Sequence, residues 1–268
     1  MIEAILHYDF LQNAVISAFF ASIVCGIIGS IVIEKKLVMM SGGIAHTSFG
    51  GIGLGYYLGI EPIITALIFS IISSLTIVRI KHTTNTDSDT LIGIFWSIGM
   101  ALGILFISLT PGYPPNMATY LFGDILTVSN SDIILIIILT TIVVGTIISF
   151  YNYWKGYLFD QEFMAVLGIN IDFLEYFLFI LIALTIVMLI RIVGIILIIA
   201  LLTAPAAIAR LYTSDLKKMM LGAVVVSIIF SFSGLIISYQ FNIASGASII
   251  LLSGITYLIL AFSRRHII

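Results

Sequence analysis

The sequence predicts an all-α membrane protein, a polytopic bundle of about nine helices that each cross the bilayer. Of its 268 residues, 61% are hydrophobic and only 9% are charged, and the mean hydropathy is +1.24. Soluble domains carry about 25% charged residues, so a water-soluble fold is excluded. The apolar residues fall in runs of about 20, the length that a helix needs to cross roughly 30 Å of hydrocarbon. No charge run, low-complexity tract or repeat interrupts them, so we expect one domain over residues 1–268.

Nine spans account for the apolar runs in chain order. Seven of them lie near 10–33, 37–58, 62–80, 90–110, 132–153, 218–239 and 246–263. The block from Phe173 to Ala209 would form one helix of about 55 Å, nearly twice the hydrocarbon thickness, so we expect it to break into two spans around 191–194. The opening MIEAILHYDF carries Glu3 and Asp9 but no basic segment. The first apolar run is therefore expected to stay in the mature protein.

The basic residues predict the orientation, because Lys and Arg are retained in the cytosol. With the N-terminus outside, ten of the eleven Lys and Arg residues fall in inner loops and only Arg191 falls outside. The C-terminus is then expected in the cytosol. Residues 111–131 form the longest outer segment, and its apolar middle predicts a short helix at the outer surface. Residues 154–172 lie inside and predict a short helix that Asp160 caps and Gly168 ends.

His46 is the only histidine within a predicted span, and no Asp, Glu, Lys or Arg lies deep in any of them. An ionisable group near mid-membrane usually faces a polar cavity or a transport path, because exposing it to lipid is costly. Gly42, His46 and Gly50 are spaced four residues apart, so the imidazole lies on a helix face without bulk. Two roles stay open for His46: contact with a transported ion, and a hydrogen bond between packed helices.

The same span is rich in glycine and reads GGIAHTSFGGIGLGYYLG. Small residues at four-residue spacing, such as Gly51, Gly55 and Gly59, let membrane helices approach closely. A GxG loop that binds a dinucleotide would have to follow a strand, and this segment lies within an apolar helix. We therefore expect close packing or gating at Gly42, Gly43, Gly50, Gly51 and Gly55.

A short polar segment follows the apolar run that contains Pro205. Pro205 has no amide proton and is expected to disturb its helix one turn before the helix ends. Thr213 or Ser214 could cap the next helix, with Asp215 near the positive end of its dipole. The segment is either an ordinary inner loop or a docking site for another protein. The docking residues would be Leu211, Tyr212, Thr213, Ser214, Asp215, Leu216 and Lys217.

Motifs of the common membrane and nucleotide enzymes do not occur in the sequence. There is no GxxxxGK[ST] phosphate loop, no HExxH, no GxSxG and no pair of aspartates within a span. The chain is therefore not expected to be an enzyme or to bind ATP itself. No basic stripe with interleaved aromatic residues suggests nucleic acid as a partner.

Five segments carry a family resemblance: EKKLVMMSGGIAHTSFGGIGLGYYLGI, LTPGYPPNMATYLFGDIL, FDQEFMAVLGI, VGIILIIALLTAPAAIARL and SYQFNIASGASIILL. In this order and spacing they resemble the membrane permease subunit of ABC importers for divalent metal ions, the zinc and manganese type. The resemblance implies a homodimer of permeases around a central path in a prokaryotic cell membrane, surrounded by lipid. It also implies a cytosolic dimer of ATPase subunits and an extracellular metal-binding protein as partners.

The resemblance assigns roles to two parts of the chain. The segment Leu211–Lys218 would be a short coupling helix that sits in a groove of the ATPase, and ATP would bind only on that partner. Zinc, manganese or iron would be the transported substrate, with no tightly bound cofactor. Where many relatives read SDALSHA, this chain has SGGIAHT over 41–47, so Gly42 replaces an aspartate one turn before His46. We therefore expect His46 to contact the ion only in transit, since a path must bind weakly.

A second departure lies near the end of the chain. Relatives often show Asp-x-Pro-Ser-Gly where this chain has Asn-Ile-Ala-Ser-Gly over 242–246. An outer turn thereby loses an acid and a proline.

Two other functions stay open. A secondary transporter driven by an ion gradient would need acidic or basic residues deep in the spans, and only His46 qualifies. The permease of a cobalamin or iron-chelate importer is the other alternative, but those chains are usually longer and typically carry Pro-His where this chain has Pro205-Ala206. The metal-ion importer fits the sequence better than either alternative.

Overall fold

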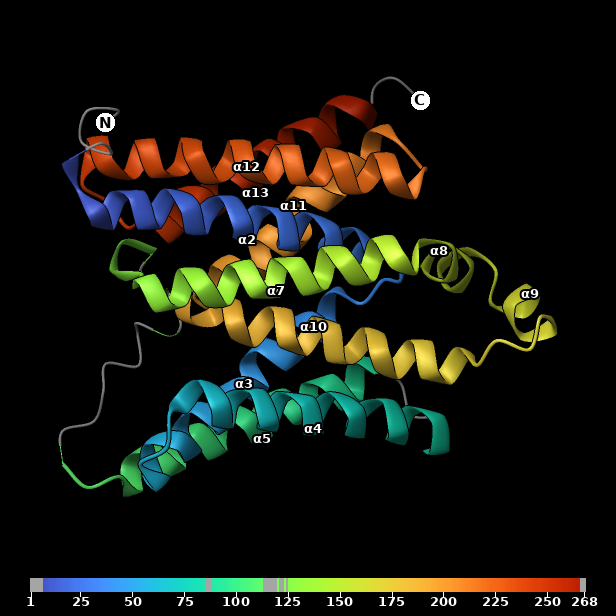
Figure 1. Cartoon of the computed structure of the whole chain (residues 1–268), viewed down its shortest axis with the longest axis horizontal. Helices are drawn as coiled ribbons and strands as arrows, with labels where there is room; N and C mark the ends of the chain where they lie inside the picture. Colours follow the sequence, from blue (N-terminus) through green and yellow to red (C-terminus); the bar gives the residue numbers. More distant parts are fainter. Residues whose placement is uncertain (1–6, 85–87, 113–119, 121–122, 124, 266–268) are drawn as a thin grey trace. The chain divides into compact units, whose positions relative to one another are not determined.

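The computed structural model describes residues 7–84, 88–112, 120, 123 and 125–265. Every regular element in these residues is a helix, which confirms the all-α fold class (Figure 1). Eight of the described helices are long and apolar enough to cross a membrane. They are α2 (Asp9–Glu34), α4 (Pro62–Thr84), α5 (Ser88–Leu109), α7 (Asn130–Ser149), α10 (Ile171–Val193), α11 (Ile195–Tyr212), α12 (Leu216–Phe241) and α13 (Ser245–Arg265).

Helix α3 (Val38–Leu58) occupies the place of the remaining expected span, 37–58. Its 21 residues would reach about 31 Å, enough to cross the hydrocarbon. Glycine, serine and His46 make it less apolar than the eight helices above. Fourteen of its residues are buried, so it needs little apolar surface to face lipid.

The long apolar block breaks at the expected place. Helix α10 ends at Val193, α11 begins at Ile195, and Gly194 between them has φ 79° and ψ 161°. Side chains other than hydrogen rarely tolerate such a positive φ, so a glycine is required. Gly123 meets this turn so closely that an added Cβ would lie 2.2 Å from the carbonyl oxygen of Val193.

The segment at 154–172 forms two short helices where one was predicted. Helix α7 stops at Ser149, before the expected end of its span at 153, and α8 (Tyr151–Phe159) and α9 (Gln161–Val166) follow. The prediction missed α8 because its stability comes from tertiary packing: Trp154 is fully buried and stacks on Phe177 of α10. The predicted boundaries of α9 are confirmed. Asp160 Oδ1 accepts a hydrogen bond from the amide of Phe163 at 3.0 Å, and Gly168 follows with φ 77°.

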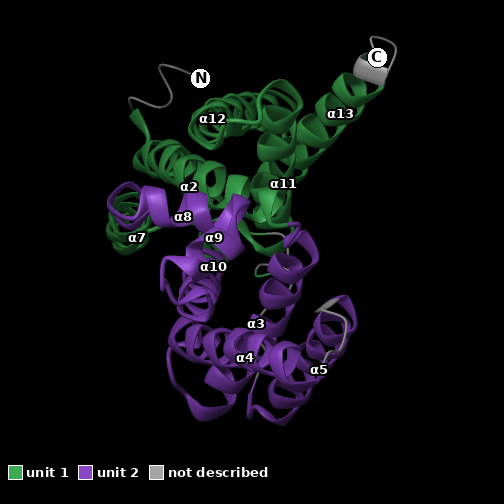
Figure 2. Cartoon of the chain, turned by 90° about the vertical axis from the view of Figure 1, so that its right-hand side faces the viewer, with its two compact units in different colours: residues 1–35, 118–145, 189–268 green, residues 36–117, 146–188 purple. Residues whose placement is uncertain are grey.

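The chain groups into two compact units (Figure 2). Unit 1 contains residues 1–35, 118–145 and 189–268, and unit 2 contains residues 36–117 and 146–188. Each unit draws on separate stretches of sequence, so neither is a continuous domain. One domain over 1–268 stays a prediction.

In unit 1, α2 packs lengthwise against α12 and also against α11 (Figure 1). A Cβ at Gly29 would lie 2.2 Å from the carbonyl oxygen of Leu202, so the α2 and α11 backbones are nearly in contact. Ser22 and Ser231 join α2 to α12 through a hydrogen bond of 3.0 Å between their hydroxyl groups. Small residues and hydroxyls are the usual means of holding membrane helices together.

In unit 2, α3 packs against α4 and α5 through the glycine-rich face. An added Cβ would lie 2.4 Å from Ile92 at Gly43, 2.9 Å from Gly99 at Gly50, and 2.5 Å from Ala66 at Gly51. At Gly55 it would lie 2.4 Å from the Thr65 hydroxyl. Gly42 is buried in the same helix. Side chains at these positions would force α3 away from its neighbours.

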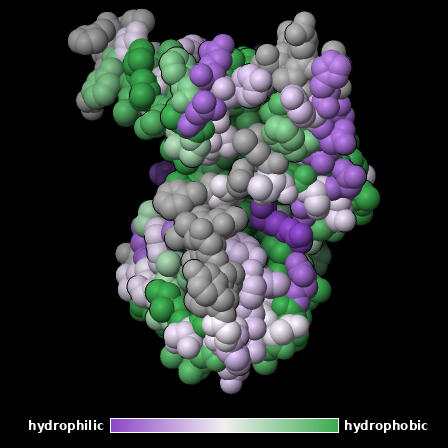
Figure 3. Space-filling view, turned by 90° about the vertical axis from the view of Figure 1, so that its left-hand side faces the viewer, coloured by the Kyte–Doolittle hydropathy of each residue, from purple (hydrophilic) through white to green (hydrophobic). Residues whose placement is uncertain are grey.

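The surface fits a protein that meets both lipid and water. Large apolar side chains lie exposed along the membrane helices, among them Ile104, Ile148 and Leu251. At the end where α2 begins, hydrophilic and hydrophobic residues are mixed (Figure 3). The helix sides can therefore face hydrocarbon while the ends reach water.

Candidate functional site

His46 lies on α3 in unit 2, half-buried, with its ring stacked on the indole of Trp96 from α5. The ring centroids are 4.0 Å apart and the planes differ by 10°. Nδ1 is buried without a hydrogen-bond partner, whereas Nε2 is not buried. Among the described residues His46 therefore makes no hydrogen bond to another helix, and Nε2 is its accessible nitrogen.

The backbones around this ring pair are held close together. The Thr47 hydroxyl donates to the Gly43 carbonyl at 2.6 Å and shares the same proton with the Phe95 carbonyl of α5 at 3.1 Å. An added Cβ at Gly99 would lie 2.5 Å from the Cα of Thr47. Thr47 and Phe95 neighbour His46 and Trp96 directly in sequence, so this contact between α3 and α5 fixes both rings. Sequence reasoning missed Trp96, since an aromatic residue in an apolar span carries no sign of its partner.

No carboxylate joins His46 in the described structure. Throughout the described ranges, no three His, Cys, Asp or Glu side chains come together as a metal site would require. Among the described residues, His46 therefore offers one nitrogen donor without a second ligand beside it.

A second polar cluster joins α4 to α10 within unit 2. Glu175 is 11% exposed at its side chain, and its carboxylate lies 3.0 Å from Lys81 Nζ and 2.8 Å from His82 Nε2. Asp172 lies 3.7 Å from the other ring nitrogen of His82. This cluster could not be predicted, because Lys81 and His82 lie more than 90 residues before Glu175 in the chain. Its pairing of opposite charges stabilises the ends of two membrane helices.

Arg191 is the one basic residue predicted to lie outside, and the structure pairs it with an acid. Its Nε lies 2.9 Å from Asp132 Oδ1 as an ion pair, although the N–H is not aligned for a hydrogen bond. The other oxygen of Asp132 accepts a hydrogen bond from the Ser129 hydroxyl at 2.6 Å. Because the Asp132 side chain is only 6% exposed, it offsets the Arg191 charge at close range.

The segment 211–217 differs from what was expected. Helix α11 contains Pro205 and runs on to Tyr212. Pro205 is buried, and the adjacent turn packs on α12 through Ala206 and Ala209. Only residues 213–215 lie outside helices, so no separate coupling helix forms over 211–218.

The cap of α12 was also predicted at the wrong residue. Asp215 itself is the N-cap, accepting a hydrogen bond from the amide of Lys218 at 2.9 Å. Thr213 instead accepts a hydrogen bond from the amide of Asp215 through its hydroxyl at 3.2 Å. Asp215 caps the helix because its carboxylate reaches the third amide of α12.

The remaining residues of this segment are partly exposed. Tyr212 is 61% exposed, Leu211 is half-buried, Ser214 and Lys217 are exposed, and Leu216 is buried. Next to the segment, Arg210 Nε lies 3.1 Å from Glu34 Oε2 in an ion pair without hydrogen-bond alignment.

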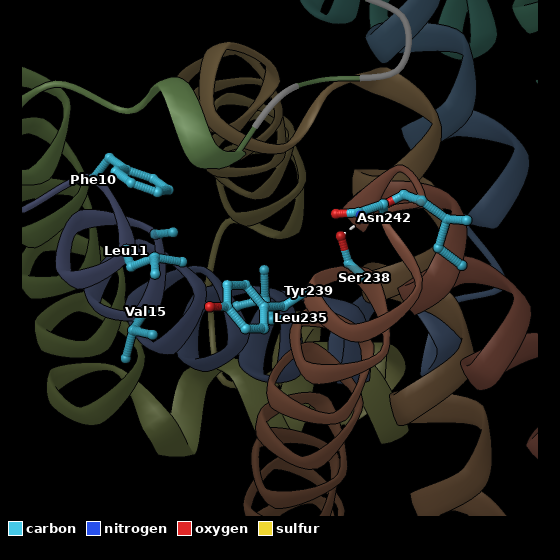
Figure 4. A pocket seen from close by; sticks show the side chains of 9 residues that line it. Phe10, Leu11, Val15, Leu235, Ser238, Tyr239 and Asn242 are labelled. Atoms are coloured by element: carbon cyan, nitrogen blue, oxygen red, sulfur yellow. Dashed lines mark hydrogen bonds between the residues drawn. The ribbon is translucent and has the colours of Figure 1, made fainter. Parts of the chain in front are cut away.

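At the other end of unit 1, α2 and α12 enclose a cavity of about 380 Å³. Phe10, Leu11 and Val15 line it from α2, while Leu235 and Tyr239 line it from α12 (Figure 4). Ser238 donates a hydrogen bond to the carbonyl oxygen of Ile243 at 2.6 Å, and Asn242 ends α12 with φ 52°. The described residues that line this cavity are apolar or neutral polar ones. Of the outer segment 111–131, most of the middle lies outside the described residues, including the place of the predicted surface helix.

Comparison with known proteins gives a consistent result. The profile of the ABC 3 transport family matches residues 7–264. The manganese transport system membrane protein MntC of Listeria monocytogenes is 36% identical over 258 residues, which cover 96% of this chain and 92% of that protein. The manganese import system permease protein ScaB of Streptococcus gordonii is 36% identical over 261 residues, with 97% and 94% covered. Among solved structures, PsaBC from Streptococcus pneumoniae in complex with Fab matches with a TM-score of 0.87 at 33% identity, covering 96% of this chain and 93% of that one.

Proposed function

This chain belongs to the ABC 3 transport family, and from that premise we propose that it is the permease of an ATP-driven importer of manganese. The observation that carries the proposal is the match over nearly the whole chain to permeases named for manganese transport and import. The fold matches that of PsaBC with a TM-score of 0.87, the described residues contain eight apolar spans, and the sequence has no ATP-binding loop. Zinc and iron are the other ions that the family resemblance implies.

In this proposal two copies of the chain enclose the path, with the N-terminus of each outside. The positive-inside distribution supports that orientation. Arg191 is the one basic residue that it places outside, and the ion pair with Asp132 offsets the charge of Arg191. His46 contributes Nε2 as a single, weak donor. Weak contact suits a path, because an ion that binds tightly does not leave.

A separate ATPase dimer would drive the permease between outward and inward states by binding its inner side. Two segments lie at that side, α9 and residues 211–217, because the chain crosses the membrane out through α10 and back through α11 between them. Helix α9 is a separate short helix that packs on α8 through Met164 and leaves its other face open to a docking groove.

Exposure also favours α9 as the main contact. Phe163 is 56% exposed and Val166 is 84% exposed, and a cavity of about 560 Å³ between α8 and α9 is lined by Phe159, Phe163 and Leu167. Exposed apolar groups of this kind mark protein interaction sites. In the other segment, Leu216 is buried and Tyr212 is the large side chain that remains exposed, so we assign 211–217 a lesser contact.

Reconstitution in liposomes tests the function. The purified permease with its ATPase and an external metal-binding protein should accumulate radioactive manganese only when ATP is supplied on the ATPase side. His46→Ala should reduce uptake while the ATPase still co-purifies. Uptake by the permease alone would instead support a secondary transporter, and preference for a labelled iron chelate over free manganese would support a chelate importer.

Co-purification tests the docking assignment. Val166→Asp and Phe163→Asp should each weaken recovery of the ATPase strongly, and Tyr212→Asp should weaken it less. Phe241→Asp is the matched control, because Phe241 is 69% exposed at the opposite end of α12. Equal recovery with every variant would refute docking at both segments. If only Tyr212→Asp reduces recovery of the ATPase, residues 211–217 are the main contact and the assignment to α9 is wrong.

A further inference from the structure

We propose that Trp96 is a positioning residue of the ion path: its indole holds the His46 ring so that only Nε2 meets the passing metal ion. The inference rests on the proposed function. It adds a residue on a different helix, with a defined task, to the single donor considered so far.

The stack defines how an ion can reach His46. The rings are 4.0 Å apart and nearly parallel, so Trp96 covers one face of the imidazole. A metal ion binds an imidazole nitrogen along its lone pair, in the plane of the ring. Nδ1 is buried without a partner, so the approach in that plane is open at Nε2. For Nε2 to offer its lone pair, the proton of the neutral ring must lie on Nδ1.

Resident metal sites orient their histidines differently. A ligating histidine almost always donates its second N–H to a carboxylate, a carbonyl or a water, which fixes the ring and makes the coordinating nitrogen more basic. His46 has no such acceptor among the described groups. Trp96 fixes the ring instead and, being uncharged, does not strengthen the donor in the way a carboxylate would. An ordered but weak donor is what a transit contact requires.

The position of Trp96 is set by the contact between α3 and α5. The hydrogen bond from Thr47 to the Phe95 carbonyl and the contact of Gly99 with Thr47 lie within one turn of the ring pair. The indole is therefore anchored to the helix that carries His46, and both rings belong to unit 2.

Fluorescence provides a direct test, because Mn²⁺ is paramagnetic and quenches a nearby indole. The protein has two tryptophans, and Trp154 is fully buried in α8. In the purified permease–ATPase complex, Mn²⁺ should quench part of the tryptophan emission, and Ca²⁺ at equal concentration should not. His46→Ala should abolish the quenching, and so should Trp96→Phe. Quenching that survives in His46→Ala would overturn the inference.

Uptake kinetics provide the second test. Trp96→Leu should raise the Mn²⁺ concentration for half-maximal uptake by roughly two- to tenfold, as expected for loss of one aromatic stack, and Trp96→Phe should restore most of it. Phe106→Leu is the matched control, because Phe106 stacks on Tyr57 between the same two helices, with ring centroids 5.9 Å apart, without touching His46.

The outcomes separate this inference from the function. If Trp96→Leu and Phe106→Leu need the same Mn²⁺ concentration for half-maximal uptake, the positioning role is refuted and the importer function is not. No ATP-dependent uptake by the unaltered protein would refute the importer itself. Where Trp96→Leu fails to assemble with the ATPase, the Trp96→Phe and His46→Ala quenching results decide.

Discussion

Replacing Gly99 with alanine should force α3 and α5 apart. The new Cβ would lie 2.5 Å from the Cα of Thr47 and 3.0 Å from its carbonyl oxygen, whereas ordinary contacts begin at 3.4 Å. The near atoms are backbone, so no side chain can swing away. The two helices would have to separate by about 1 Å where they carry His46 and Trp96.

The size of the effect follows from a matched pair on the same helix. Gly93 has nothing within 4 Å of an added Cβ, so Gly93→Ala gains helix propensity without a clash. That gain is roughly 0.5–1 kcal/mol and applies to both variants. Overpacking costs about 1–3 kcal/mol and applies only to Gly99→Ala. The free energies of unfolding of the two variants should therefore differ by about 1–3 kcal/mol.

The assay is unfolding of both purified variants in the same mixed micelles, followed by tryptophan fluorescence. The free energy of unfolding of Gly93→Ala should equal or exceed that of the unaltered protein, and that of Gly99→Ala should be lower than that of Gly93→Ala. If Gly99→Ala is as stable as Gly93→Ala, the close contact between α3 and α5 does not constrain the protein and the reasoning fails.

Three further predictions concern other parts of the molecule. Arg210→Ala leaves the Glu34 carboxylate, 6% exposed, without its partner and should lower the free energy of unfolding by about 1–3 kcal/mol; unchanged unfolding in micelles would contradict this. Asp160→Ala removes the cap of α9 and should cost that helix about 1 kcal/mol, visible as faster amide exchange over 161–167; unchanged exchange would argue against the cap. Burial, and then the charge of Glu175, raises the pKa of Tyr157. The unfolded tyrosine ionises near pH 10 while the folded one stays protonated, so stability should be full below about pH 10 and fall above it. Tyr157→Phe should reduce that fall, and an identical alkaline profile would refute it.

Much of the fold could be predicted from local signals. The break at Gly194 followed from the length of the apolar block, and the cap at Asp160 followed from its place before a short helix. These features depend on a few neighbouring residues. The choice of Asp215 over Thr213 or Ser214 as the cap of α12 was not predictable, because all three can cap and the backbone path selects one.

The candidate site was predictable only in part. His46 was found because an ionisable group in an apolar span is conspicuous by itself. Its partner Trp96 and the Glu175 cluster were not found, since each joins residues that are far apart in the chain. The helix that packs beside Pro205 was not predictable either, because Ala206 and Ala209 are small residues that could meet any neighbouring helix, and the fold places α12 there.

The sequence by itself determined that this protein is a multi-pass membrane protein and where its membrane-crossing helices run. Hydrocarbon thickness and the cost of burying charge act on each segment separately, so composition and length suffice to predict spans. Only the tertiary structure decided which nitrogen of His46 is accessible and which aromatic ring holds it. That outcome depends on how closely α3 and α5 approach, and glycine contacts spread over both helices set this distance.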